Sequence, residues 1–306
     1  MQKVVVFGGS GFLGSHVADI LSDHDYEVVI FDRTESPYLK SDQKMIVGDI
    51  LDYNQVEKAV DGAEYVYHYA ALADIGEAQN KPLATVKINV LGSVNILEAC
   101  RHHNVKRFIY GSTVYVYSEH GSFYRSSKQS TELFIENFHK IYGLDYTILR
   151  YGSLYGKRAN NFNSINNIIR QALLEGKIER KGDGSEIREY INVIDAARAS
   201  VNILDENYVN SHIILTGTQT MKVKELLEMI KEMLNDEIDI SYLDEKIEEH
   251  YEITPYSFRP RFAKKYILNY YHDLGQGILE SIYDNYEKIH NEEDKKIKID
   301  FTTDSI

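Results

Sequence analysis

The strongest constraint on the fold of this chain is a regular alternation of short apolar runs and amphipathic segments through its first half. Each apolar run is followed by a stretch whose apolar residues recur at helical spacing. Unbroken apolar strands separated by helices are typical of a parallel sheet that helices cover on both faces. The predicted strands are residues 3–9, 27–33, 45–50, 63–71, 107–113 and 145–156, and the predicted helices are 12–24, 54–62, 85–104 and 124–143.

This alternation predicts an α/β fold, a Rossmann-type doubly wound parallel sheet followed by a smaller mixed α/β C-terminal lobe. After about residue 155 the alternation of apolar runs and amphipathic segments becomes less regular, but no Gly/Ser-rich linker separates the two parts. We expect residues 1–155, joined by about 188–205, to form the sheet domain, and 156–187 and 206–290 to form the lobe. The charged segment 291–306 reads as a flexible tail. Later predicted elements are helices 164–176, 194–204, 220–234 and 274–289 and a strand at 212–217.

The charge of the chain limits its partners. A net charge of −13 argues against a nucleic-acid or anionic-membrane surface, either of which needs clustered positive charge. The apolar runs are too short to span a bilayer, so we expect a soluble cytoplasmic protein without a membrane partner. The single cysteine, Cys100, can form no internal disulfide and reads as a buried thiol, and no metal site is expected.

A glycine motif lies between the first predicted strand and helix. Gly8, Gly11 and Gly14 have the spacing G-x-x-G-x-x-G. Glycine lets the turn bend sharply and lets the backbone approach a pyrophosphate, whose charge is stabilised by free N–H groups at the helix N-terminus. The pattern alone is weak evidence, but a strand before it and a helix after it are the context that a dinucleotide site requires.

The second predicted strand ends in an acidic residue, Asp32, eighteen positions beyond Gly14. A carboxylate there accepts hydrogen bonds from the adenosine ribose hydroxyls and repels a 2′-phosphate, which favours NAD over NADP. Arg33 could contact the adenine or a 2′-phosphate. Asp49 could hold the adenine amino group, or it could be an ordinary turn or helix-cap aspartate.

Tyr124 and Lys128 are four residues apart and therefore share one face of a predicted helix. Such pairs are common by chance, so the spacing means little alone. Here the hydroxyl pair Ser112 and Thr113 ends the strand that precedes this helix. The context makes a catalytic pair a hypothesis worth testing.

Taken together, these motifs resemble those of the extended short-chain dehydrogenases/reductases of the NAD-dependent epimerase/dehydratase family, whose members act on nucleotide sugars. The similar segments run in the family's order from Gly8 to about residue 288. They are "GGSGFLGSH", "GDI", "YHYAA", "NVLGSVNILEA", "RFIYGSTVYVYS", "YRSSK", "LRYGSLYG", "GDGSEIREYINVIDAARA" and "FRP".

The resemblance implies a role for each matching residue. Tyr124 would be the acid/base, Lys128 and the positive nicotinamide would lower its pKa, and Thr113 would share the substrate proton. Asn89 would hold a cofactor-side loop, and the cofactor would be NAD bound by residues 1–155. The residues expected to bind it are Gly8, Gly11, Phe12, Leu13, Gly14, Asp32, Arg33, Asp49, Ile50, Tyr69, Ala70, Ala71, Ala73, Asn89, Ser112, Tyr124, Lys128 and Tyr151.

The reaction is narrowed by the two residues after Thr113. Family dehydratases carry Asp-Glu there and decarboxylases a glutamate nearby, whereas this chain has Val114 and Tyr115. Tyr124, Thr113 and NAD suffice for a nucleotide-sugar 4-epimerase acting through a transient 4-keto intermediate, an isomerase of the kind used in polysaccharide biosynthesis. An NAD(P)H-dependent keto-sugar reductase, a 4,6-dehydratase and a non-catalytic NAD(P)-binding sensor remain alternatives.

The substrate side departs from the family pattern. By resemblance Arg188 and Arg259 would bind the diphosphate, because a guanidinium fits phosphate oxygens bidentately. Ser153 stands where the family has an amide, and Asn163 could supply the missing contact. The family's R-P-G-D is R-P-R-F, followed by Lys264 and Lys265.

Two further features bear on the surroundings of the site. The segment between Thr113 and Tyr124 is shorter than in relatives, which implies a more open site or cover from elsewhere. The resemblance also implies a homodimer in which helices at about 86–103 and 124–141 form a four-helix bundle.

Overall fold

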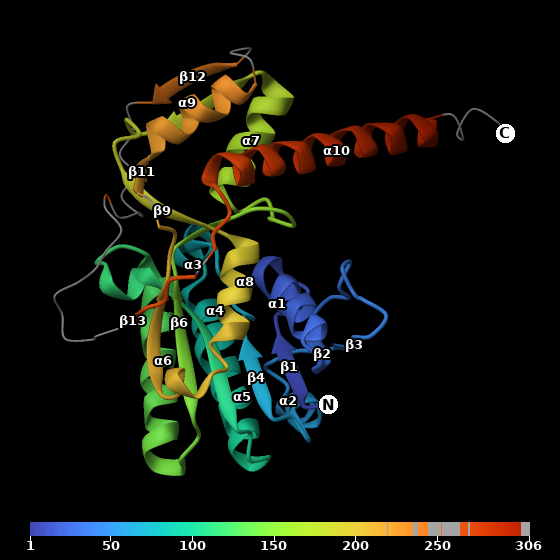
Figure 1. The fold of residues 1–306 in the computed structure, drawn as a ribbon, viewed down its shortest axis with the longest axis vertical. Helices are drawn as coiled ribbons and strands as arrows, with labels where there is room; N and C mark the ends of the chain where they lie inside the picture. The colour runs from blue at the N-terminus through green and yellow to red at the C-terminus, as the bar shows by residue number, and fades with distance from the viewer. Residues whose placement is uncertain (219, 235–237, 244–251, 253–263, 269, 301–306) are drawn as a thin grey trace.

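The computed structural model describes residues 1–306 except 219, 235–237, 244–251, 253–263, 269 and 301–306, and for 291–300 it describes the backbone only. The described part consists of a sheet domain with a smaller lobe above it (Figure 1).

The sheet domain is built on an eight-stranded parallel sheet in the order β13-β10-β6-β5-β4-β1-β2-β3. The strand order reverses between β1 and β4, which is the switch point where open α/β sheets bind ligands. The strands are β1 Lys3–Phe7, β2 Glu27–Asp32, β3 Lys44–Val47, β4 Tyr65–His68, β5 Arg107–Thr113, β6 Tyr146–Tyr151, β10 Ser211–Leu215 and β13 Lys264–Lys265.

Helices cover both faces of this sheet because the strand side chains alternate between two cores. Val5 and Phe7 belong to one core and Val4 and Val6 to the other. On one face α1 (Phe12–Asp23) packs against α8 (Val193–Asn202), and on the other α2 (Tyr53–Val60), α5 (Gly92–His102) and α6 (Ser122–Tyr142) lie side by side. The predicted doubly wound parallel sheet is confirmed.

The C-terminal lobe has its own apolar core, which includes Ile169, Leu226, Ile230 and Ile278. A mixed sheet in the order β11-β9-β7, a parallel pair β12-β8 and the lobe helices surround this core above the carboxyl ends of the main strands (Figure 1). The domain boundaries expected from the sequence stay predictions. The lobe elements are β7 Ser153–Tyr155, α7 Ser164–Glu175, β8 Lys177–Lys181, β9 Ile187–Asn192, β11 Thr220–Lys222, α9 Val223–Met233, β12 Asp239–Leu243 and α10 Leu274–Asp300.

Several short elements depart from the sequence prediction. The helix expected over 85–104 is divided into α4 (Pro82–Thr85), a π-helical turn η1 (Val86–Leu91) and α5. Helix α3 (Ile75–Asn80) and the 3-10 turns η2 (Val114–Tyr117) and η3 (Glu206–Tyr208) were not predicted, because each is too short to show a periodic pattern.

The expected flexible tail, 291–306, stays a prediction, although part of it is helical. Helix α10 continues to Asp300, ten residues into the segment 291–306. The physical reason is that this segment is rich in Glu and Lys, which are good helix formers, and contains no proline before residue 300.

One stretch among the described residues, Pro82–His102, is long and apolar enough to pass a test for a membrane span, with a mean hydropathy of 1.3. Its most apolar window is 44% buried inside the protein, where α5 packs against α2 and α6. A core helix of a folded domain passes the same test, so this finding is weak evidence for a membrane.

Candidate active site

The glycine turn between β1 and α1 is too tight for any larger residue. Gly8 has φ +79°, and a Cβ there would lie 2.4 Å from the backbone nitrogen of Ala70. A Cβ on Gly14 would lie 2.2 Å from the carbonyl oxygen of Gly8. The turn therefore brings the first residues of α1, Phe12 and Leu13, close to the end of β1, where the N–H groups of the helix can receive phosphate oxygens.

Asp32 ends β2 beside this turn. Its carboxylate accepts hydrogen bonds from the backbone N–H of Ser10 at 3.1 Å and of Thr34 at 3.4 Å. These bonds fix the carboxylate beside the glycine turn, and its contact with the ribose hydroxyls stays a prediction. Arg33 is exposed next to it.

Asp49 and Ile50, the next two predicted cofactor residues, differ in their exposure to solvent. Asp49 is exposed and accepts a hydrogen bond from the N–H of Leu51 at 2.9 Å, as an aspartate in a turn does. Ile50 is buried against Gly92, where a Cβ would lie 2.5 Å from the Ile50 side chain. Contact of either residue with adenine stays a prediction.

Asn89 joins the loop after β4 to helix α6. Its side chain accepts from the N–H of Leu72 at 2.7 Å and donates to the carbonyl of Leu72 at 3.0 Å and to the hydroxyl of Ser127 at 2.9 Å. Leu72 lies among the predicted cofactor residues Ala70, Ala71 and Ala73, so Asn89 fixes the backbone of that loop.

Tyr69 and Tyr151 lie one behind the other. The hydroxyl of Tyr69 is 3.3 Å from that of Tyr151, which in turn is 2.6 Å from the hydroxyl of Ser200 in α8. Tyr151 is buried and belongs to the core on the α8 side of the sheet. The structure thus places Tyr151 behind Tyr69, where it supports that side chain.

The three predicted catalytic residues come together at the carboxyl end of β5 and the first turns of α6. The Thr113 hydroxyl hydrogen-bonds the Tyr124 phenol. The Lys128 ammonium nitrogen lies 5.7 Å from the centroid of the Tyr124 ring and 4.7 Å from that of Tyr110, and it donates to the carbonyl of Gly111 at 2.8 Å.

Burial shifts both ionisable groups of this set. It raises the pKa of Tyr124 to about 12, although the hydrogen bond from Thr113 partly offsets the rise. It lowers the pKa of Lys128 to about 7, while the negative charge of Glu132 acts in the opposite direction. Lys128 thus sits where a small change in nearby charge alters its protonation near neutral pH, whereas Tyr124 holds its proton.

The described substrate residues are more constrained than the sequence suggested. Asn163 caps α7, accepting from the N–H of Asn166 at 3.1 Å and donating to the carbonyl of Leu154 at 2.7 Å, so its amide is engaged within the protein. Arg188 is 8% exposed and donates to the carbonyl of Ile187 at 3.1 Å. Ser153 begins β7 and is partly buried, and Arg259 lies outside the described residues.

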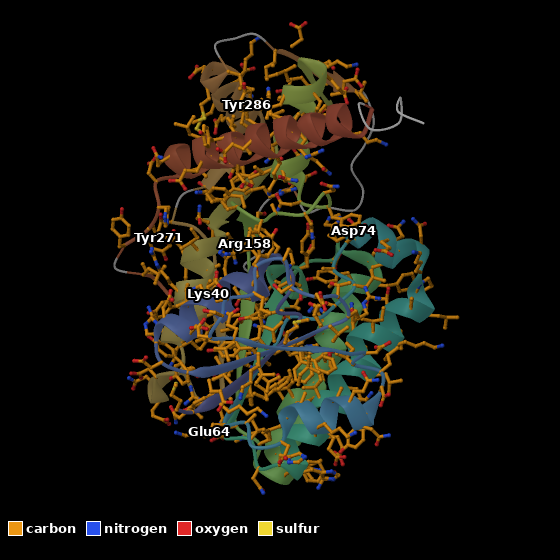
Figure 2. All side chains as sticks on the ribbon, turned by 90° about the vertical axis from the view of Figure 1, so that its right-hand side faces the viewer. Lys40, Glu64, Asp74, Arg158, Tyr271 and Tyr286 are labelled. Atoms are coloured by element: carbon orange, nitrogen blue, oxygen red, sulfur yellow. The ribbon has the colours of Figure 1, made fainter. Side chains whose placement is uncertain are left out.

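The carboxyl ends of the strands face the lobe, as Figure 2 shows. Glu64, just before β4, lies at the far end of the sheet domain, whereas Asp74 and Arg158 lie beneath the lobe (Figure 2). The cofactor turn, the catalytic set and the lobe therefore meet at one edge.

A buried ion pair behind the catalytic set was missed from the sequence. Glu132 in α6 and Arg150 in β6 are both fully buried and joined at 2.7 Å. The available signal was a charged residue inside each of two otherwise apolar patterns, "TELFI" and "TILRY".

Comparisons with known proteins agree with this geometry. The chain is 31% identical over 250 residues to a putative UDP-glucose 4-epimerase of Methanocaldococcus jannaschii, covering 74% of this chain and 81% of that one. It is 28% identical over 278 residues to a UDP-N-acetyl-alpha-D-glucosaminuronate decarboxylase of Bacillus cytotoxicus, covering 81% and 86%.

Among solved structures, the UDP-N-acetylglucosamine 4-epimerase of Methanobrevibacter ruminantium M1 superposes with a TM-score of 0.82 at 28% identity, covering 94% of this chain and 99% of the other. The sequence also matches the NAD dependent epimerase/dehydratase family over residues 4–217, which contain the glycine turn, Asp32 and the catalytic set. The chain therefore belongs to the NAD-dependent epimerase/dehydratase family.

Proposed function

We propose that this protein is an NAD-dependent 4-epimerase of a nucleotide-diphosphate sugar. The observation that carries the proposal is an intact set of Thr113, Tyr124 and Lys128 without a carboxylate next to Thr113. Val114 is buried against Ile214, and Tyr115 packs against the same small cluster. Glu132, which lies behind Ser112, accepts its hydroxyl and is paired with Arg150, so it is not available as a base.

The roles of the residues follow from their placement. Tyr124 would take the proton of the sugar C4 hydroxyl as the 4-keto intermediate forms and return it when the other epimer is made. Lys128, held by the Gly111 carbonyl, would favour the phenolate, and Thr113 would share the proton with Tyr124. Bound NAD supplies the acceptor for the C4 hydride and its source on return.

The cofactor residues fit NAD for two reasons that the chain itself provides. The space at Gly8 and Gly14 is closed to any Cβ, as a turn under a pyrophosphate requires. The Asp32 carboxylate would receive the ribose hydroxyls and would repel a 2′-phosphate. An epimerase keeps its cofactor through the cycle, whereas a reductase must exchange it at every turnover.

We propose that the nucleotide diphosphate lies along the lobe side of this edge, near Arg188. Arg259 and Ser153 are expected as further substrate contacts. A cytoplasmic location is also expected. Lys265 is paired with Glu189 at 3.5 Å, so part of the basic character after R-P-R-F is neutralised locally. The base and the sugar are left to experiment.

We also propose a homodimer that pairs α5 and α6 with their symmetry mates. The two helices are neighbours, and Arg101 of α5 lies over the Tyr142 ring of α6 at 4.8 Å. Large apolar side chains are exposed along α4, η1 and α6 on this side, which we call the α5–α6 face: Leu83, Val86, Leu91, Leu133, Phe134, Ile141 and Tyr142.

The first experiment is an NMR time course of the purified protein, without added cofactor, against a panel of UDP-, GDP-, CDP- and dTDP-sugars. We expect one pair of C4 epimers to interconvert. Tyr124→Phe should lower the rate by about 10²–10⁴-fold while the protein retains its cofactor. The control Tyr283→Phe, at an exposed position on α10, should match the wild type.

Other outcomes would point elsewhere. Consumption of NAD(P)H with a 4-keto sugar, and no epimerisation, would identify a reductase. Loss of carbon dioxide or water from the sugar would identify a decarboxylase or dehydratase and would contradict the interpretation of Val114 and Tyr115. No change in any sugar, and an unaltered Tyr124→Phe variant, would favour the sensor.

A further inference from the structure

The Glu132–Arg150 pair is an unusual component of a protein core. The Arg150 Nε donates to one carboxylate oxygen of Glu132 at 3.0 Å and the Arg150 Nη2 to the other at 2.7 Å, and both side chains are fully buried. Removing two charges from water costs several kcal/mol for each ion, and pairing often does no more than repay this cost. Stability is therefore a weak reason for the pair to exist here.

The pair is bonded to both sides of Thr113. On the strand side, the Ser112 hydroxyl donates to Glu132 at 2.6 Å. On the other side, Arg150 lies over the Tyr117 ring at 4.8 Å and donates to the Tyr117 hydroxyl. One ion pair thus fixes the backbone immediately before Thr113 and the turn immediately after it.

Helix α6 holds the same short segment from a second direction. Gln129 donates to the carbonyl of Val116 at 2.8 Å, and Arg125 donates to the carbonyl of Ser118 at 2.7 Å. Both donors lie on the helix that carries Tyr124 and Lys128. The segment between Thr113 and Tyr124 is therefore attached to α6 at two points, Val116 and Ser118.

Glu132 also lies one helical turn beyond Lys128 and supplies a negative charge to it. The other groups around the ammonium are the rings of Tyr110 and Tyr124 and the imidazole of His68. Burial lowers the pKa of His68 to about 3, so the imidazole is neutral at pH 7. The two rings and the Gly111 carbonyl favour a charged Lys128 through their partial charges, and Glu132 adds a full negative charge to them.

We propose that Glu132 and Arg150 form a positioning pair that holds Thr113 against Tyr124 and, through the charge of Glu132, keeps Lys128 protonated for catalysis. The catalytic part of this inference rests on the proposed epimerase function. Glu132 and Arg150 act through other residues, since Glu132 accepts from Ser112, the neighbour of Thr113, and Arg150 donates to Tyr117.

The test uses Glu132→Gln, which keeps the shape of the side chain and removes its charge. The matched control is Glu136→Gln, the same change one turn further along α6, at a carboxylate that contacts His212 at 3.4 Å and reaches Arg150 through that imidazole. Lys128 is followed in the purified protein by the ¹³Cε chemical shift of labelled lysine as a function of pH, with Lys128→Met to assign the signal.

We expect Glu132→Gln to lower the titration midpoint of Lys128 by about one pH unit or more, and Glu136→Gln to leave it within a few tenths of a unit. In a single turnover with a sugar nucleotide at pH 7, reduced cofactor, followed by its absorbance, should appear at least about tenfold more slowly in Glu132→Gln than in wild type. Cofactor content and melting temperature are measured on the same samples, since a purely structural role would change those instead.

A Lys128 midpoint that is the same in Glu132→Gln and wild type, in folded protein, would overturn the electrostatic part. If Glu132→Gln does not fold, Tyr117→Phe replaces it, because the ring stays and only the hydroxyl that accepts from Arg150 is lost. A fall in kcat with an unchanged KM would support positioning, and wild-type kcat would contradict it. If wild type reduces no cofactor with any sugar nucleotide, the proposed function fails, and the lysine titration alone decides the inference.

Discussion

At the scale of single residues, Lys128 combines a buried position with a proposed role that needs a positive charge. It is 3% exposed, and burial lowers its pKa to about 7 from an ordinary value of 10.5. Between pH 7 and 10.5 the unfolded chain keeps a proton at this lysine that the folded protein has released. The unfolded state then binds more protons, so the contribution of Lys128 to stability must rise with pH across that window.

Lys128→Met removes this titration, so the comparison with wild type isolates it. We expect the melting temperature of wild type, relative to Lys128→Met, to rise by several degrees between pH 6.5 and pH 9.5 in protein stripped of nucleotide, at about 2–4 °C for each kcal/mol. Thermal denaturation followed by circular dichroism measures it. Parallel melting temperatures across the range would show that Lys128 keeps an ordinary pKa in the folded protein.

The sequence was sufficient to select candidate site residues that are marked by their spacing from a strand or a helix. Gly8, Gly14, Asp32, Tyr124 and Lys128 each lie at a fixed distance from the end of a strand or the start of a helix, and such distances are visible in a sequence. The predicted sugar contact of Asn163 stays a prediction, and the sequence could not show its second role, because an asparagine before a helix is also a good cap.

At the scale of elements, the π-helical turn η1 determines where Asn89 points. The turn frees the Asn89 carbonyl, which accepts the hydroxyls of Ser93 at 2.6 Å and Thr131 at 2.9 Å. The Asn89 side chain is then left to bind both backbone groups of Leu72. Its 1% exposure means that water cannot replace those bonds.

We therefore expect Asn89→Ala to lower the free energy of unfolding by about 2–4 kcal/mol, because it leaves two backbone groups of Leu72 buried and unpaired. It should also speed the loss of cofactor, since the loop of Ala70 to Ala73 loses its anchor. The control Asn207→Ala, on the exposed turn η3, should stay within about 0.5 kcal/mol of wild type. Chemical denaturation and cofactor retention on a desalting column measure both effects.

An equal loss of stability in Asn89→Ala and Asn207→Ala would mean that the buried hydrogen bonds of Asn89 stabilise the protein no more than those of an exposed asparagine. If Asn89→Ala is destabilised but retains its cofactor as wild type does, the loop of Ala70 to Ala73 does not contribute to holding the cofactor.

The sequence could not reveal η1, because one extra residue in a turn does not change the apolar pattern enough to interrupt a helical reading over 85–104. Nor could it pair Glu132 with Arg150, which lie eighteen positions apart on different elements. Only the parallel pairing of β5 with β6 and the packing of α6 on them bring the two charges together.

At the scale of the whole molecule, the alternation of strands and helices was enough to predict the parallel sheet, because each apolar run is long enough for one strand and each helix returns the chain. The lobe was predicted less completely. Its strands are short and pair across long stretches of sequence, as β8 does with β12, so no local pattern specifies them.

The proposed homodimer also belongs to the scale of the whole molecule. The α5–α6 face exposes Leu133 at 44%, Phe134 at 40% and Ile141 at 65%, all on α6, and a face of this kind is stable in water when a second copy covers it. Leu133→Arg would place a charge within that contact, where the guanidinium would lose its hydration without gaining a partner.

We expect wild type to behave in light scattering as twice its 35.3 kDa chain mass, and Leu133→Arg to fall to the single-chain value with its circular dichroism preserved. The control is Leu279→Arg, whose leucine is 47% exposed on α10, away from the α5–α6 face. The two leucines are similarly exposed, so the two variants place the same charge at equally accessible positions on different surfaces. A monomeric wild type, or a Leu133→Arg dimer, would remove the four-helix bundle from the description of this protein. Dissociation by Leu279→Arg alone would instead move the subunit contact to the lobe, and the apolar side chains of α6 would then need another explanation.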